Sequence, residues 1–257
     1  MNEQEIATQL NHRTVRRFSA KKLSPNTIDT LISVAQHTST SHYLQSMSLI
    51  HITDQKTRKE ISQISNQSYV NGNGELFIFL VDLYRANQIA VKNGHPKNYL
   101  GSMDKFLQGC ADATLAVQNV VNAAESMNLG AVILGSIQND AGQLIKLLKL
   151  PKLTFPILGL IVGIPSEKPT FKPRLPRNLM YFQNSYNLSD LKTSSLQDYD
   201  KVIHKYYETR NSNRRQETFS HLISKSAIEM PAKRKELFKV LKHQGFFPEA
   251  AVEPLNQ

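Results

Sequence analysis

The chain has 257 residues and a formal net charge of +10, with 40% hydrophobic and 20% charged residues. These values are typical of a soluble globular protein with one large domain or two small ones. The polar first residues carry no secretory signal, and apolar runs such as 76–81 and 156–162 are too short to span a bilayer. The single cysteine, Cys110, excludes an internal disulfide and favours a reducing cytoplasm.

Helices and strands alternate along the first two thirds of the chain. A short helix is expected over 4–11, and Ser24-Pro25 predicts the start of a second, because serine is a favoured N-cap and proline suits the first helical position. The periodicity then predicts strands at 47–53, 76–81, 131–135 and 156–163, and helices at 55–65, 84–93 and after Asp140. Asp54 and Asp140 are expected to cap the helices that follow them. The run at 76–81 is continuously apolar, which indicates a central strand.

The longest helical pattern runs from Met103 to Met127 and ends at a glycine stop, Gly130. Its apolar face is too wide for a surface helix. We interpret it as the central core helix, with part of that face at a subunit interface. Cys110 lies on this face and is expected to be a small buried hydrophobe.

A proline-rich stretch follows the last predicted strand. Residues 165–177 are expected to form an extended arm, because proline interrupts helices and removes a hydrogen-bond donor from strands. Residues 177–195 are irregular in pattern, and helices are expected at 197–209, 216–230 and 232–243. The whole order predicts an α+β fold, with helices packed around a central sheet.

The basic segment, residues 12–18, combines cationic, hydroxyl and imidazole side chains near the start of the chain. Guanidinium groups bind phosphate through paired, charge-assisted hydrogen bonds, so one interpretation is a site for a phosphorylated ligand. The alternative is a solvated basic stretch, which is the commoner meaning of such a run. Its members are His12, Arg13, Thr14, Val15, Arg16, Arg17 and Phe18.

The sequence lacks the motifs for metal binding, nucleophilic catalysis and dinucleotide binding. The eight histidines do not pair with cysteines or carboxylates at metal-ligand spacing, so no metal is expected. No nucleophile motif is present, and the glycines at 72 and 74 precede a strand, where a dinucleotide fold needs them after one. Polar and basic loops with little acid–base equipment are typical of a protein whose chemistry belongs to a bound cofactor. We therefore name no catalytic residue.

A series of short segments lies in collinear order over nearly the whole sequence. They are His12-Arg13-Thr14-Val15-Arg16 with Phe18, Thr38-Ser39-Thr40-Ser41 with Leu44-Gln45, Gln67 with Tyr69-Val70, Ala124-Glu125-Ser126-Met127 through Leu134-Gly135-Ser136, Lys172-Pro173-Arg174-Leu175-Pro176, Asn184-Ser185-Tyr186, Tyr206-Tyr207-Glu208-Thr209-Arg210, and Asn213-Arg214-Arg215 with Glu217-Thr218-Phe219-Ser220. In this series the chain resembles the FMN-dependent nitroreductase family, in its NADPH-nitroreductase and flavin-reductase branch.

This resemblance implies a homodimeric three-layer α+β sandwich, with a mixed or antiparallel sheet and one FMN at each site of the dimer interface. It implies a single domain over 1–257, in which 165–257 form an extended arm and helical excursion. NADPH would donate a hydride, and nitroaromatics, quinones or free flavin would accept electrons in ping-pong order. No nucleic acid or membrane partner is implied.

The resemblance also assigns roles to particular residues. The basic segment would hold the FMN phosphate and ribityl chain, the serine-rich loop would meet the flavin of the other subunit, and the glycine turn would face the ring near N5. Arg210 would bind the 2′-phosphate of NADPH. The implied FMN contacts are His12, Arg13, Thr14, Arg16, Ser39, Thr40, Ser41, Gln67, Gly135, Ser136, Lys172 and Arg174.

The sequence departs from the family pattern at three points. The turn commonly reads Gly-Gly and here reads Gly135-Ser136, Gln138 stands where a basic residue is common, and the serine loop continues as His42-Tyr43. These departures bear on the choice of electron acceptor more than on FMN binding.

Three alternatives remain open from the sequence, one of which is a family member that has lost enzymatic activity and merely binds flavin. The protein could act mainly as a flavin reductase that hands reduced FMN to another enzyme. The +10 charge also suits a nucleic-acid-binding protein, although no recognised module and no basic patch interleaved with aromatic residues is found.

Overall fold

The structure, a computed structural model, describes residues 3–187, 193–209 and 214–248. The chain forms two compact units, one of Met1–Lys168 with Pro231–Gln257 and the other of Pro169–Met230. The first unit contains the sheet and most of the expected site residues. The single domain over 1–257 stays a prediction.

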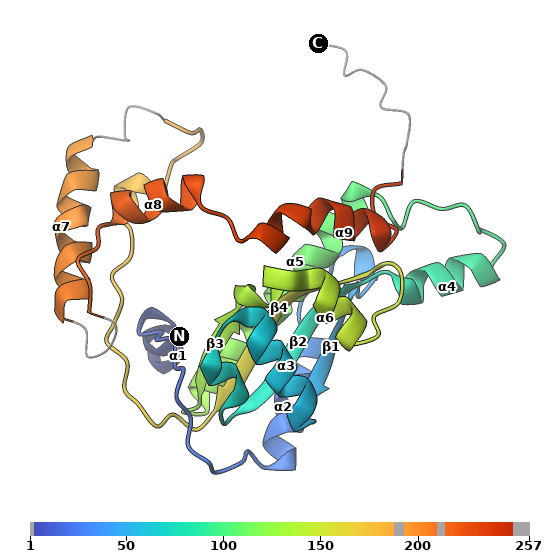
Figure 1. The fold of residues 1–257 in the computed structure, drawn as a ribbon, viewed down its shortest axis with the longest axis horizontal. Coiled ribbons are helices and arrows are strands. Elements are labelled where there is room, and N and C mark those ends of the chain that lie inside the picture. The colour runs from blue at the N-terminus through green and yellow to red at the C-terminus, as the bar shows by residue number, and fades with distance from the viewer. Residues whose placement is uncertain (1–2, 188–192, 210–213, 249–257) are drawn as a thin grey trace. The chain divides into compact units, whose positions relative to one another are not determined.

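Four strands form the sheet of the first unit in the described chain: β1 (Met47–Ile52), β2 (Glu75–Asp82), β3 (Gly130–Leu134) and β4 (Thr154–Gly163). Their order is β1-β2-β4-β3, and every neighbouring pair is antiparallel (Figure 1). This sheet agrees with the expected α+β class. As the apolar run predicted, β2 is central and buried along its length.

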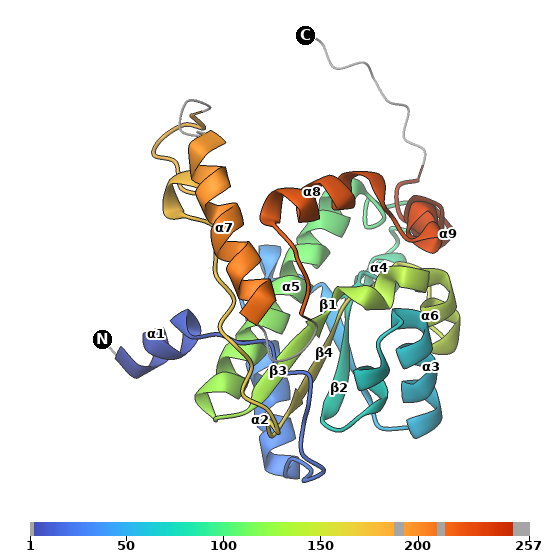
Figure 2. The same ribbon diagram turned by 60° about the vertical axis from the view of Figure 1, so that its left-hand side comes forward.

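Helices cover both faces of the sheet. On β2, Leu76, Ile78 and Leu80 pack with α3 (Gln55–Ser65) and α6 (Ala141–Leu147), whereas Phe77 and Phe79 pack with α2 (Pro25–Gln36) and α5 (Met103–Ser126) (Figure 2). Successive side chains of a strand point to opposite faces, so a strand between two helical layers must be apolar at every position. The predicted three-layer sandwich is therefore confirmed.

Side chains cap the helices of the first unit where the sequence predicted it. Ser24 accepts a hydrogen bond from the Thr27 N–H at 3.1 Å, and Asp54 accepts one from Thr57 at 2.7 Å. Because the hydroxyl and amide of Thr57 both donate to its carboxylate, the pKa of Asp54 is lowered. Asp140 caps α6 in the same manner, as predicted, and Ser102 caps α5 although no cap was predicted there.

The remaining elements follow the predicted order with small shifts. Those of the first unit are α1 (Glu3–Leu10), the 3-10 turns η1 (Ser41–Tyr43), η2 (Ser68–Asn71), η3 (Gly135–Asp140) and η6 (Ala232–Glu236), α4 (Tyr84–Lys92) and α9 (Leu237–His243). The helix predicted over 232–243 therefore opens with a 3-10 turn. In the described residues, no helix combines the length and apolarity needed to cross a membrane.

The second unit packs around aromatic side chains. It contains η4 (Arg177–Leu179), α7 (Thr193–Thr209) and α8 (Phe219–Ile228), and the arm before η4 is extended as predicted. Tyr199, Ile203 and Tyr207 form its buried core, with Leu175 and Phe219 packed against them. Helix α7 begins before the predicted residue 197, and α8 is shorter at both ends than predicted.

Candidate functional site

The basic segment runs along the edge of the sheet formed by β3. Thr14 forms a parallel bridge with Ala131, and the Val15 N–H donates to the Ala131 carbonyl at 3.0 Å. The approach is close, since a Cβ added at Gly130 would lie 2.7 Å from Val15. Glycine at 130 therefore allows the segment to lie against β3.

Two carboxylates fix this segment further. The Glu167 carboxylate accepts hydrogen bonds from the backbone N–H groups of Arg16 (3.0 Å) and Arg17 (3.2 Å). Glu125, at the end of α5, contacts Nδ1 of His12 at 2.6 Å and so orients the imidazole. The Arg16 side chain is exposed, and its guanidinium lies 6.0 Å from the centre of the Tyr69 ring.

Residues 67–74 form a loop beside the basic segment, called here the 67–74 loop. It contains Gln67 and Tyr69. The Asn73 side chain donates to the Phe18 carbonyl at 3.1 Å, which joins the loop to the segment. Buried Arg58 holds the loop from within, because its guanidinium donates to the carbonyls of Val70 (2.7 Å), Asn73 (3.1 Å) and Gly74 (2.6 Å). Burial lowers the pKa of Arg58, although a guanidinium stays charged at neutral pH.

The glycine turn follows β3. A Cβ added at Gly135 would meet no described heavy atom within 4 Å, so there is open space over this residue. Arg234, in η6, donates to the Gly135 carbonyl and to Oδ1 of Asn139. Gln138, which replaces the basic residue expected from the family, donates to the Ile157 carbonyl at 2.9 Å. Both ends of the turn are thereby fixed.

The serine-rich loop lies elsewhere. Ser39, Thr40 and Ser41 precede β1, which is the edge strand opposite β3. With strands about 4.8 Å apart, the two edges are separated by about 14 Å. Ser39 and Thr40 line a cavity of about 1370 Å³ together with residues of α2, β1 and α4. The structure thus brings His12 to Arg16, Gln67 and Gly135-Ser136 to one side of the sheet, and the serine loop to the other edge.

Lys172 and Arg174 belong to the second unit. The Lys172 ammonium lies 5.9 Å from the centre of the Tyr207 ring, and Arg174 donates to the Lys172 carbonyl at 2.6 Å. Tyr199 donates to the Pro173 carbonyl at 3.3 Å, and burial raises its pKa. The arm is therefore laid along α7. Arg210 lies outside the described residues.

Sequence reasoning missed the residues that position the others. Arg58, Asp112 and Glu167 contact the loops of the site, yet each lies in an unremarkable stretch of sequence. A carboxylate on the apolar face of α5 was the one available signal for Asp112, because an ionised side chain is rarely buried without partners. Among the described residues, no group of three His, Cys, Asp or Glu side chains is arranged to hold a metal ion.

The fold is an α+β three-layer sandwich with a basic segment along one edge of its sheet. The nitroreductase family model matches residues 10–164, and the model of the nitroreductase family C-terminal domain matches 172–249. The chain therefore belongs to the nitroreductase family.

Individual relatives agree over nearly their full lengths. The FMN reductase (NADPH) of Bacillus subtilis is 39% identical over 244 residues, covering 94% of this chain and 97% of its own. An NADPH-dependent oxidoreductase of Staphylococcus saprophyticus is 36% identical over 251 residues, covering 96% and 99%. The structure of the NfrA1 nitroreductase from B. subtilis superposes with a TM-score of 0.87 at 38% identity, covering 94% of this chain and 98% of that one.

Proposed function

We propose that the protein is an FMN-dependent oxidoreductase that uses NADPH to reduce nitroaromatics, quinones or free flavin in ping-pong order. The observation that carries the proposal is the similarity to an FMN reductase (NADPH) over 94% of the chain. When bound, FMN would supply the redox chemistry between NADPH and the acceptor, and the hydride transfer itself requires no side-chain general base.

The residues present fit FMN. Its phosphate carries between one and two negative charges at neutral pH, by analogy with other phosphate monoesters, and the guanidinium groups of Arg13 and Arg16 lie on one segment that is held at the sheet edge. Thr14 and the His12 imidazole, oriented through its Nδ1 by Glu125, add polar groups beside them. The open space over Gly135 supports the proposed role of its turn, whose backbone amides would face the flavin ring near N5.

The other assigned residues complete the proposed FMN contacts. Gln67 would make a polar contact from the loop that Arg58 holds, and Ser136 would offer its backbone amide with Gly135. Lys172 and Arg174 would add cationic contacts to the flavin, as the family resemblance implies. Arg210 would bind the 2′-phosphate of NADPH.

A homodimer follows from the same proposal. Ser39, Thr40 and Ser41 lie at the sheet edge opposite the basic segment, which favours contact with the flavin of another subunit. Leu107 and Leu115 of α5 are 59% and 50% exposed, and a subunit interface would cover them. The proposed compartment is the cytoplasm, where NADPH is the reductant and a lone cysteine stays reduced.

The visible spectrum of the purified protein tests the proposal directly. A flavin spectrum that bleaches on anaerobic addition of NADPH, and returns on addition of a quinone or nitroaromatic, is the expected result. Parallel double-reciprocal lines would identify ping-pong order. A colourless protein that takes up no FMN would contradict the proposal.

One relative's name favours a second candidate. Because the B. subtilis relative is an FMN reductase (NADPH), the main product here could be reduced free FMN for a partner enzyme. Steady-state rates with free FMN that exceed those with quinones and nitroaromatics would favour this second function.

A further inference from the structure

Residues 38–46 form the 38–46 loop, in which three residues have positive φ angles. His42, Tyr43 and Gln45 have φ angles of 51°, 57° and 51°, and none of them is glycine. This left-handed region is unfavourable for residues with a Cβ. Their side chains are exposed, with Tyr43 at 81%, so side-chain packing does not account for the conformation. Hydrogen bonds must hold it.

Asp112 supplies the largest set of those hydrogen bonds. Its side chain lies on α5 and the residue is 3% exposed. Oδ2 accepts from the Thr40 hydroxyl at 2.6 Å and from the Ser46 N–H at 2.9 Å, and Oδ1 accepts from the Ser41 N–H at 2.9 Å. One carboxylate therefore joins three points of the loop, before and after its left-handed residues.

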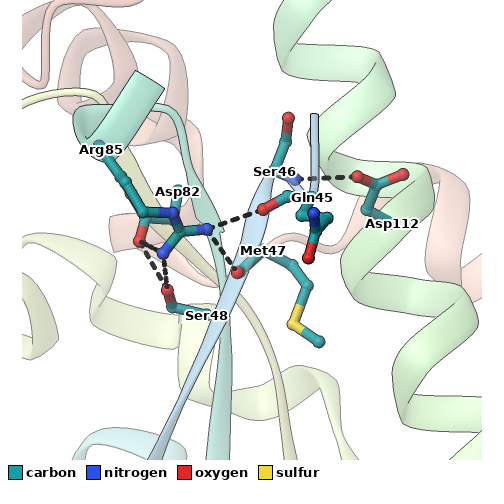
Figure 3. A network of polar contacts seen from close by, with 7 residues as sticks. All are labelled: Gln45, Ser46, Met47, Ser48, Asp82, Arg85 and Asp112. Carbon is teal, nitrogen blue, oxygen red and sulfur yellow. Dashed lines mark hydrogen bonds and ion pairs between the residues drawn. The ribbon is translucent and has the colours of Figure 1, made fainter. Parts of the chain in front are cut away.

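A second anchor acts on the far end of the loop (Figure 3). The Arg85 guanidinium donates to the carbonyls of Gln45 at 2.7 Å and Met47 at 3.3 Å, and Asp82 aligns it at 3.2 Å. The Gln45 N–H in turn donates to the Thr40 hydroxyl oxygen at 2.9 Å. Gln45 is thus fixed at both its N–H and its carbonyl, and Thr40 links this anchor to Asp112.

We propose that Asp112 is a positioning residue for the flavin: it holds Ser39, Thr40 and Ser41 in the conformation that contacts FMN. This inference rests on the proposed function, because the loop's contact with FMN is part of that proposal. Asp112 itself does not contact the cofactor in this account. Its carboxylate is turned to the loop and is satisfied by the three donors.

The chemistry of the carboxylate gives a sharp test. All three loop groups donate, so the site requires two acceptor oxygens. An asparagine has the same shape but one oxygen. If its NH₂ group faces Ser41, the Ser41 N–H loses its acceptor; if it faces the other way, the Ser46 N–H and the Thr40 hydroxyl lose theirs. Asp112→Asn therefore releases one end of the loop without removing volume from the helix packing.

The experiment compares Asp112→Asn with Asp104→Asn, a control on the same helix whose exposed carboxylate contacts Gln108 and Lys105. FMN affinity of each apoprotein is measured by fluorescence titration at a temperature where both are folded, and the visible spectrum of the bound flavin is recorded. Limited chymotrypsin digestion of the apoproteins reports on the loop without FMN, since Tyr43 and Leu44 are exposed cleavage sites.

Loss of one net hydrogen bond predicts a rise of about tenfold in the FMN Kd of Asp112→Asn, a changed flavin spectrum, and faster cleavage after Tyr43 or Leu44. Asp104→Asn should match the wild type in all three. Wild-type affinity, spectrum and cleavage in Asp112→Asn would overturn the inference, as would a lowered melting temperature with unchanged affinity and spectrum. If the wild type takes up no FMN, the proposed function fails instead, and the role of Asp112 toward the flavin fails with it.

Discussion

Arg58 offers the most direct test of how the 67–74 loop is held. The residue is 5% exposed, and its guanidinium donates three hydrogen bonds to carbonyls of the loop, at 2.6 to 3.1 Å. Replacing it by methionine fills a similar volume with an apolar chain. The carbonyls of Val70, Asn73 and Gly74 then lose their donors. Any of them that stays buried has also lost its hydrogen bonds to water, which destabilises the folded state.

The magnitude follows from these contacts. A hydrogen bond that involves a charged group contributes about 1.5–3 kcal/mol, and an acceptor left unpaired costs about 1–3 kcal/mol. The desolvation of the guanidinium, which lowers its pKa, offsets part of this sum. We therefore expect Arg58→Met to lower the free energy of unfolding by about 3 kcal/mol. Arg58→Lys should recover only part of the loss, because an ammonium cannot reach three carbonyls in the fork geometry of a guanidinium.

Equilibrium unfolding in urea, with FMN absent, measures this free energy. Lys59→Met is the matched control, since Lys59 is an exposed cation on the same helix, and it should stay within about 0.5 kcal/mol of the wild type. An Arg58→Met protein as stable as Lys59→Met would refute the reasoning, because it would mean that the three carbonyls find other donors or water without cost.

Further predictions concern the cofactor, the donor, the cysteine and the assembly. Arg16→Ala should weaken FMN binding by about tenfold or more in a dialysis or fluorescence assay, whereas Arg17→Ala, which removes an exposed ion pair with Glu167, should not. Arg210→Ala should lower kcat/KM for NADPH by on the order of tens-fold, mostly through KM, and leave NADH turnover unchanged; equal losses with both donors would contradict its role. Burial raises the pKa of the Cys110 thiol from 9.0 to about 11, so thiol labelling at pH 8 should be about a hundredfold slower in the folded protein than in urea. Light scattering should give twice the 29.1 kDa of one chain, and a monomer mass at micromolar concentration would exclude the dimer.

Local signals in the sequence determined the secondary structure well. Ser24 with Pro25, and Asp54 ahead of an amphipathic run, marked helix starts that the structure reproduces, because N-caps act over three residues. The unbroken apolar run of β2 predicted burial on both faces of the sheet. The predictions missed the start of α7 and the 3-10 turn before α9, because periodicity locates a helix better than it locates the first residue of the helix.

The candidate site likewise contains residues that the sequence indicates and residues that only the fold brings together. The basic segment could be proposed from its own residues, because phosphate chemistry needs particular residue types close together along the chain, whereas the glycine turn was proposed from the family resemblance. The carboxylates that hold the basic segment could not be recognised in the sequence. Glu167 lies 151 positions from Arg16, and Glu125 lies 113 positions from His12. Such pairs meet only because β3, β4 and α5 bring distant segments to one edge of the sheet.

The sequence by itself thus determined the α+β class, the order of elements, and the residues suited to bind a phosphate. The tertiary structure alone decided which polar groups hold them: Arg58 behind the 67–74 loop, and Asp112 behind the 38–46 loop, 71 positions from Ser41. The physical reason lies in burial. A charged side chain inside the protein must find its partners among backbone groups that lie near it in space, and the packing of strands and helices sets where those groups lie.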